Sequence, residues 1–183
     1  MFTWLKSRAQ DRRTAIDLYG AVVTQARQPA FFGSQGVSDT PEGRTAMIIA
    51  LMFPVLERLG TEGRRTARVA RYLSETFVTD VDDTLREMGV GDMSVPKKVK
   101  RAAQALGERC LAYRRAVQAA DPTAVLSAEL AVSVPGLEAN SQGADALARR
   151  ILKLNDHLGA VPLDRLTAGI AEFTASNEAR RLA

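Results

Sequence analysis

Apolar residues recur at helical spacing over residues 64–117, and this pattern constrains the fold more than any other feature of the chain. Steps of four, four, four, four and three separate Val69, Leu73, Phe77, Val81, Leu85 and Met88. Steps of four, three, four, three and four separate Val99, Ala103, Leu106, Cys110, Tyr113 and Val117. An α-helix places residues three and four apart on one face, whereas a strand alternates at every second residue. The two series therefore predict two long amphipathic helices in succession.

The other segments also have helical features, and none has the alternation of a strand. One helix is expected to open at Asp39 or Thr40, where Glu42 can complete a capping box with Asp39. Further helices are expected over 14–27, 121–132, 144–158 and 163–181, and the best linker candidate is 133–143. We predict an all-α fold, a single-domain bundle of about six to seven helices that covers 1–183.

Composition limits the classes of function. The chain of 183 residues is long enough to bury one core. Its single cysteine, Cys110, excludes an internal disulfide framework and a zinc site with several thiolates, and suits a reducing compartment. The first 13 residues lack the apolar stretch of a signal peptide, and the most apolar segment, 46–56, is shorter than the roughly 20 residues that span a bilayer. We expect a soluble protein that is at most peripheral to a membrane.

The corner between the two amphipathic helices reads LREMGVGDMSVPKKVKR over 85–101. A phosphate-binding loop needs a strand before its glycines and a Ser or Thr after its lysine, and neither is present. A helical corner fits better, because Gly89 can end a helix in the left-handed conformation, Ser94 can cap the next helix and Pro96 fits its first turn. The corner is therefore not expected to hold a nucleotide.

The charges at this corner oppose both helix dipoles. Four acids lie at the end of the first helix, and four basic residues lie at the start of the second, where the dipole disfavours cations. Either the two groups pair across the corner, or the cations face an external anionic partner. The net charge of +4 also favours acidic partners such as RNA, anionic lipid or an acidic protein face. The predicted partner-binding residues are Lys97, Lys98, Lys100, Arg101 and Arg109.

A catalytic or metal site is not indicated. The only histidine, His157, is far in sequence from Cys110. The pair Asp82–Asp83 is similar to the aspartate-rich magnesium sites of helical isoprenoid synthases, but a second acidic cluster is missing. We expect no enzyme activity, no metal and no cofactor.

Residues 47–56 are apolar on nearly all sides of the expected helix. Such a helix is either central to the core or incompletely covered. The pair Phe31–Phe32 lies in the loop before it, and methionines are common in adaptable binding surfaces. The segment is therefore also a candidate for an apolar binding patch.

Three stretches of the chain form a distinctive set: LYGAVVTQARQPAFF at 18–32, GVSDTPEGR at 36–44 and TLREMGVGDMSVPKKVKR at 84–101. Together they resemble the ubiquinol–cytochrome c chaperone family, which occurs in mitochondria and as a short form in alphaproteobacteria. The resemblance covers about 15–118 and is expected to fade beyond Asp121, which divides the domain into a family core at 14–120 and variable C-terminal helices at 121–183. A histidine often found in the apolar helix of the family is replaced by Met52, so its role does not carry over.

The resemblance implies an all-helical, non-enzymatic assembly chaperone. Its client would be newly made cytochrome b, bound near the ribosomal exit tunnel with a small partner subunit, during assembly of ubiquinol–cytochrome c reductase. The implied location is the bacterial cytoplasm at the inner membrane, or the matrix side of the mitochondrial membrane. The alternative function is a basic module that binds RNA or an anionic lipid surface. The predicted client-binding residues are Tyr19, Phe31, Phe32, Arg44, Met47, Ile48, Leu51, Met52 and Met88.

Overall fold

The chain folds into an all-α structure, described here by a computed structural model over residues 2–33, 36–60, 63–167 and 170. No strand occurs in these ranges, where the only bridge is an isolated one between Phe32 and Val37. The prediction of an all-α bundle is therefore confirmed. The helices are α1 (Phe2–Ala26), η1 (Pro29–Phe31), α2 (Pro41–Gly60), α3 (Gly63–Glu87), α4 (Val95–Val117), α5 (Pro122–Ser133), α6 (Gln142–Ala160) and η2 (Leu163–Arg165).

Helix α2 is the centre of the core. Every residue from Met47 to Val55 is buried, and α2 packs against α1, α3, α4 and α6. The helix continues through Pro54 without ending. The sequence allowed this apolar helix to be either central to the core or incompletely covered. Because four neighbouring helices pack around α2, the central position is confirmed and the incomplete cover is wrong.

The start of α2 differs in detail from the expected capping box. The Thr40 hydroxyl accepts a hydrogen bond from the Gly43 amide at 3.1 Å, whereas Asp39 accepts one from Arg44 Nε at 2.7 Å. Thr40 is therefore the capping residue. Asp39 pairs with an arginine instead of with the helix end.

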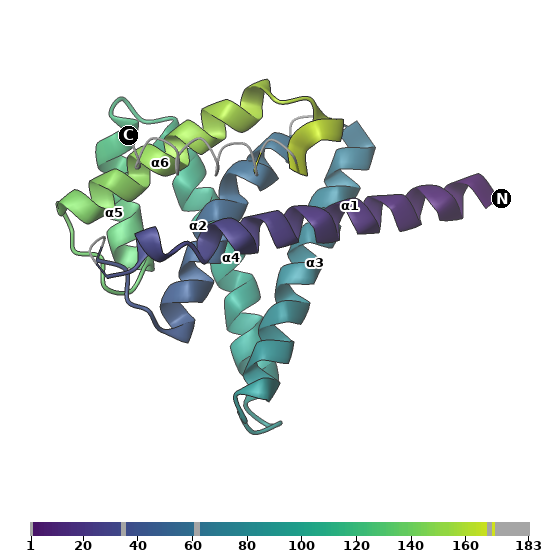
Figure 1. Cartoon of the computed structure of the whole chain (residues 1–183), viewed down its shortest axis with the longest axis horizontal. Coiled ribbons are helices and arrows are strands. Elements are labelled where there is room, and N and C mark those ends of the chain that lie inside the picture. Colours follow the sequence, from purple (N-terminus) through teal and green to yellow (C-terminus); the bar gives the residue numbers. More distant parts are fainter. Residues whose placement is uncertain (1, 34–35, 61–62, 168–169, 171–183) are drawn as a thin grey trace.

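Helix α1 crosses the bundle and packs mainly against α3 (Figure 1). It begins at Phe2, earlier than the expected start at Thr14. Asp11 is fully buried and pairs with Arg68 at 2.6 Å and Arg65 at 3.1 Å, both on α3. Burial of this carboxylate between two guanidinium groups fixes α1 against α3.

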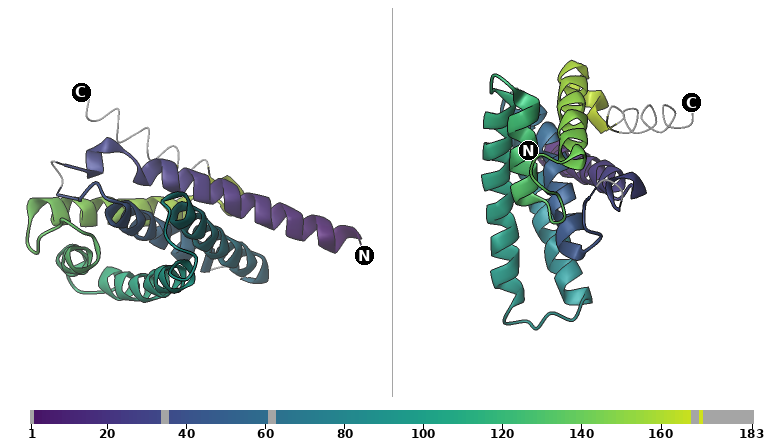
Figure 2. Two further views of the ribbon diagram at one scale, coloured as in Figure 1. Left: turned by 90° about the horizontal axis from the view of Figure 1, so that it is seen from below. Right: turned by 90° about the vertical axis from the view of Figure 1, so that its left-hand side faces the viewer.

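The corner between α3 and α4 projects away from the rest of the molecule (Figures 1 and 2). Gly89 has a φ of 73°, and the amides of Gly89 and Val90 donate to the carbonyls of Arg86 and Leu85 at 2.9 and 3.0 Å. This arrangement satisfies the last carbonyl groups of α3, as a left-handed glycine commonly does. The Ser94 side chain makes no capping hydrogen bond, contrary to expectation.

The loop between α5 and α6 belongs to the same domain as the other helices. Its Pro135 carbonyl accepts a 2.9 Å hydrogen bond from the Ser38 amide, and a Cβ at Gly136 would lie 2.4 Å from the Gly36 carbonyl oxygen. The segment 133–143 is therefore a packed connection, not a linker between domains. As expected, Asp121 caps α5 and accepts a hydrogen bond from the Ala124 amide at 3.0 Å. The last expected helix, over 163–181, lies largely outside the described residues.

Candidate functional site

The aromatic pair that precedes α2 is divided between the core and the surface. Phe31 is 4% exposed, and the guanidinium of Arg150 lies 4.5 Å from its ring centroid. Arg150 is held in place by a 2.7 Å hydrogen bond from its Nη2 to Gln28 Oε1. Phe31, one of the predicted client-binding residues, is therefore a core residue, and an arginine from α6 covers its ring. Nothing in the sequence pattern around 28–32 signalled this contact.

Phe32 and Arg44 form the accessible part of this region. Phe32 is half-buried, and the Arg44 guanidinium lies 5.9 Å from its ring centroid. A hydrogen bond from Arg44 holds the pKa of the exposed Asp39 carboxyl below its ordinary value. Arg44 is thus kept beside Phe32 by Asp39, at the first turn of α2.

Most of the other predicted client-binding residues lie in the core. Tyr19 is 6% exposed, and its hydroxyl donates a 2.7 Å hydrogen bond to Asp80. The predicted residues on α2 are 0–7% exposed, so a partner cannot contact their side chains in this conformation; they are Met47, Ile48, Leu51 and Met52. The structure therefore brings these side chains together in the interior and leaves Phe32, Arg44 and Met88 on the surface.

Two methionines are exposed where α3 meets α4. Met88 is 54% exposed, and Met93, in the corner that follows, is 95% exposed. Because this corner projects from the body, both side chains are accessible to a partner. Their position is separate from the aromatic pair in sequence.

The basic residues at the start of α4 have no carboxylate partner in the part of the chain that the structure describes. Lys97, Lys98, Lys100 and Arg101 are exposed and Arg109 is partly buried, and none takes part in an ion pair within the described part of the chain. The nearby acids have other partners: Asp80 binds Tyr19, and Asp82 and Asp92 bind Arg86 at 2.7 and 3.1 Å. The pairing across the corner that the sequence allowed is therefore not formed among these residues.

The end of α4 behaves differently from its start. Arg114, one of seven basic residues on this segment, makes a bidentate ion pair with Glu57 of α2, with a shortest distance of 2.6 Å. Its side chain therefore contributes to packing between α2 and α4. The accessible basic surface is concentrated in the first two turns of α4.

The single cysteine, Cys110, lies in a partly buried position on α4. Burial, followed by the charge of Glu57, raises the pKa of Cys110 to about 12, so its thiol is neutral at ordinary pH. No group of three or more His, Cys, Asp or Glu residues in the described ranges is placed to hold a metal ion. A membrane-spanning helix is likewise not found there, since no described helix combines sufficient length with sufficient apolar character.

Comparisons with known proteins agree with the resemblance noted in the sequence. A family model described as ubiquinol-cytochrome C chaperone matches residues 34–173. The crystal structure of the Cbp3 homologue from Brucella abortus is similar to this chain, with 31% identity and a TM-score of 0.77 over 92% of this chain and 94% of the other. No curated protein sequence matches. The matched range continues well beyond Asp121, where the resemblance was expected to fade, because α5 and α6 are part of the same core.

Proposed function

Because the chain belongs to the ubiquinol–cytochrome c chaperone family, we propose that it is a non-enzymatic assembly chaperone that binds newly made cytochrome b. In this role it assists assembly of ubiquinol–cytochrome c reductase. The observation that carries the proposal is the family match over 34–173, together with a similar fold in the Brucella abortus protein. A location in the bacterial cytoplasm at the inner membrane is part of the proposal.

Client contact begins at the accessible side chains. Phe32 with Arg44, at the start of α2, and Met88, at the end of α3, offer apolar surface to an apolar client. The buried candidates support this surface from below: Phe31 lies next to Phe32, and Met47 follows Arg44 within one turn of α2. The remaining members of the predicted set, Tyr19, Ile48, Leu51 and Met52, maintain the shape of the surface by packing in the core.

The basic start of α4 contacts a second, anionic partner. Cations in the first turns of a helix are opposed by the helix dipole. No carboxylate in the described ranges forms an ion pair with Lys97, Lys98, Lys100 or Arg101 and offsets this cost. An anionic partner bound to these cations would offset their unfavourable interaction with the helix dipole. The ribosome near its exit tunnel, an acidic partner subunit and an anionic membrane surface all supply such charge.

The same observation favours a second candidate function, a basic module that binds RNA or anionic lipid and has no client. The two functions respond differently to salt. Binding to phosphate groups weakens steeply as salt rises, whereas apolar client binding persists. Exposed aromatic side chains that could stack on bases are missing from the described length of α4, where Tyr113 is buried.

Removal of the gene from the native host tests the proposed function. We expect loss of assembled ubiquinol–cytochrome c reductase and a decrease in cytochrome b, while another respiratory complex remains at its normal level. Restoring the wild-type gene should restore the reductase. Normal reductase levels in the deletion strain would contradict the proposal.

A further inference from the structure

The starts of α1 and α3 lie side by side at the end of α3 that is farther from the corner. Arg68 of α3 donates hydrogen bonds to Asp11 at 2.6 and 2.8 Å and to Ser7 at 3.5 Å, both on α1. Beyond this contact, the first turns of α1 project past the rest of the molecule (Figures 1 and 2). Every residue from 6 to 10 is exposed. Since these residues make up more than one helical turn, this part of α1 presents all of its sides to solvent.

Basic residues are concentrated in this region. The segments 6–13 and 63–71 hold eight of the chain's 25 lysine and arginine residues but only one of its 21 acids, Asp11. Because the whole chain has a net charge of +4, the remainder of the chain is slightly acidic. We define the α1–α3 basic surface as the basic residues of these segments that are exposed: Lys6, Arg8, Arg12, Arg13, Arg64, Arg65 and Arg71.

Several cations of the α1–α3 basic surface lack an acidic partner. The buried Asp11 is already shared by Arg65 and Arg68, and Glu75 lies 3.4 Å from Arg71. Four residues of the surface take part in no ion pair within the described ranges: Lys6, Arg12, Arg13 and Arg64. The surface therefore has positive charge that the described part of the protein does not balance.

The helix dipoles add to this imbalance. Neither α1 nor α3 has an acid in its first turn, whereas Arg64 and Arg65 directly follow Gly63, the first residue of α3. Cations near the start of a helix are disfavoured by its dipole. An anionic partner would offset both the unpaired charge and the dipole, so charge complementarity indicates an anionic ligand.

Apolar groups near these cations favour a lipid surface over a nucleic acid. Ile16 of α1 is 53% exposed, and the sequence of α1 before Lys6 is FTWL. Helices that lie at an anionic bilayer surface combine Lys and Arg with Phe, Leu and Trp in this way. The Tyr72 ring is not open for a base to stack on, because the guanidinium groups of Arg12 and Arg71 lie 5.8 and 5.2 Å from its centroid.

We propose that the α1–α3 basic surface binds an anionic lipid bilayer, with the first turns of α1 at the level of the lipid headgroups. The inference rests on the proposed function in taking the membrane as the place where the chaperone works. The basic start of α4 lies near the opposite end of α3 (Figure 1). That second surface remains available to another anionic partner.

Charge reversal on the α1–α3 basic surface tests the inference. The test variant combines Lys6→Glu, Arg13→Glu and Arg64→Glu, which replace three cations that form no ion pair in the described ranges. The full-length proteins are mixed with vesicles of phosphatidylcholine alone or of equal parts phosphatidylcholine and phosphatidylglycerol. Flotation then separates the protein that is bound to vesicles from the protein that is free.

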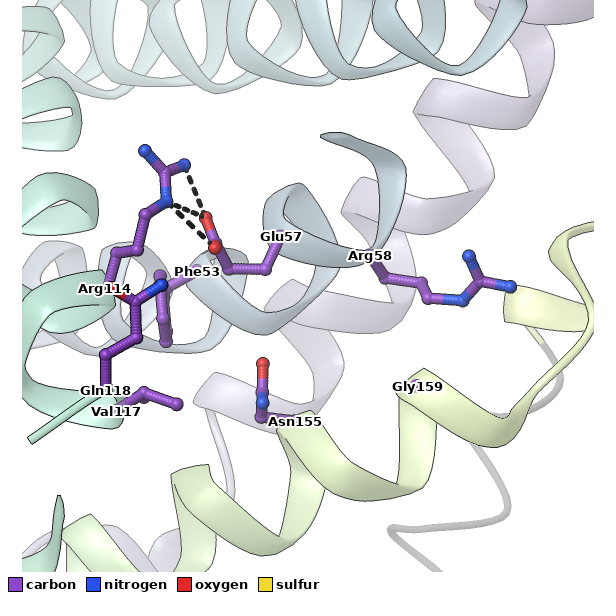
Figure 3. A pocket seen from close by; sticks show the side chains of 8 residues that line it. All are labelled: Phe53, Glu57, Arg58, Arg114, Val117, Gln118, Asn155 and Gly159. Carbon is purple, nitrogen blue, oxygen red and sulfur yellow. Dashed lines mark hydrogen bonds and ion pairs between the residues drawn. The ribbon is translucent and has the colours of Figure 1, made fainter. Parts of the chain in front are cut away.

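The matched control changes the net charge by the same amount at the other basic surface. It combines Lys97→Glu, Lys98→Glu and Arg101→Glu, at exposed positions in the first turns of α4. Arg114, at the end of α4, is unsuitable for the control because it is bound to Glu57 (Figure 3). The melting temperature of each variant shows that the fold is retained.

We expect the wild type to bind the anionic vesicles and not the neutral ones. The test variant should bind about a hundredfold more weakly, from the roughly additive contributions of three cations near an anionic surface. The control should lose at most severalfold. Trp4, on α1, is the only tryptophan of the chain. Its fluorescence should shift to the blue when the wild type binds anionic vesicles, a measurement that needs no variant.

Equal loss of vesicle binding in the test variant and the control would overturn the inference. Vesicle binding with an unchanged Trp4 spectrum, or tighter binding to single-stranded RNA than to anionic vesicles, would also overturn it. Capture of cytochrome b by a wild-type protein that binds no anionic vesicles would reject the lipid surface and leave the proposed function intact. Vesicle binding that requires the α1–α3 basic surface, in a protein that never captures cytochrome b, would support the inference and reject the proposed client.

Discussion

The hydroxyl of Tyr19 donates a 2.7 Å hydrogen bond to Asp80 Oδ2 and thereby joins the middle of α1 to α3. Burial, strengthened by the hydrogen bond and the negative charge of Asp80, raises the pKa of Tyr19 above its ordinary value. The phenol therefore stays neutral and remains a donor throughout the physiological range. We therefore propose that Tyr19 supports the fold, although the family resemblance had placed it among the predicted client-binding residues.

Replacement of Tyr19 by Phe should lower the free energy of unfolding by about 1.5 kcal/mol, the lower end of the range for a hydrogen bond to a charged group. Capture of cytochrome b should be unchanged at temperatures where the variant is folded. Chemical denaturation and a capture assay provide the two measurements. Unchanged stability with lost capture would return Tyr19 to the client surface.

The two phenylalanines before α2 should respond differently to substitution. Phe31→Ser should destabilise the protein by about 3–5 kcal/mol, the typical loss for a large core side chain, because Phe31 is 4% exposed. Phe32→Ser should lower the melting temperature less than Phe31→Ser does and should weaken client capture, since Phe32 is only half-buried against the core and lies beside Arg44. Equal losses of stability in the two variants would show that Phe32 is also a core residue.

Replacement of Lys97, Lys98 and Arg101 by glutamate should weaken binding of the anionic partner and leave the fold intact. These substitutions remove no ion pair that forms within the described ranges, and acids in the first turns of α4 suit the helix dipole. The melting temperature should therefore stay the same or rise slightly. As a control, Arg114→Glu breaks the ion pair with Glu57 and should therefore lower the melting temperature.

A fall in melting temperature for the triple variant, corrected by reversing Asp82 and Asp83 to lysine, would instead demonstrate pairing across the corner. Binding measured at low and high salt then separates the two partners. The anionic partner should be lost at high salt, whereas the apolar client should be retained.

The free cysteine gives a prediction about pH. The raised pKa of Cys110, about 12, means that the thiol is protonated below that value in the folded protein. Alkylation by iodoacetamide at pH 8 should therefore be slow when the protein is folded and fast when it is unfolded. The stability that comes from the neutral thiol is complete below its unfolded pKa and is lost as pH rises through about 12. Rapid alkylation of the folded protein at pH 7 would contradict this environment.

Local patterns predicted the helices well because each pattern depends on nearby residues. The steps from Val69 to Met88 identified α3, and Asp121 identified the start of α5 through its own capping hydrogen bond. Helix ends that carry no capping signal were harder to predict. No clear apolar periodicity precedes Thr14, yet α1 begins at Phe2. A helix of moderate propensity can extend wherever packing stabilises the adjoining turns.

The surface could be predicted only in part, because exposure depends on residues that are distant in sequence. Arg150 on α6 covers Phe31, which is 119 positions earlier, and no local pattern contains that contact. The all-round apolar character of α2 was compatible with both a core and a binding surface. Contacts with four other helices decided for the core.

The basic start of α4 was easier to predict, since its charges are consecutive and its dipole conflict is local.

Direct capture of cytochrome b tests the central claim most closely. The tagged protein is isolated from the native host during synthesis of newly labelled cytochrome b, and the bound material is washed at high salt before analysis. We predict that labelled cytochrome b stays bound to the wild-type protein after the wash and that Phe32→Ser retains much less of it. Bound material that consists only of nucleic acid or lipid, is released by salt and contains no cytochrome b would contradict the account.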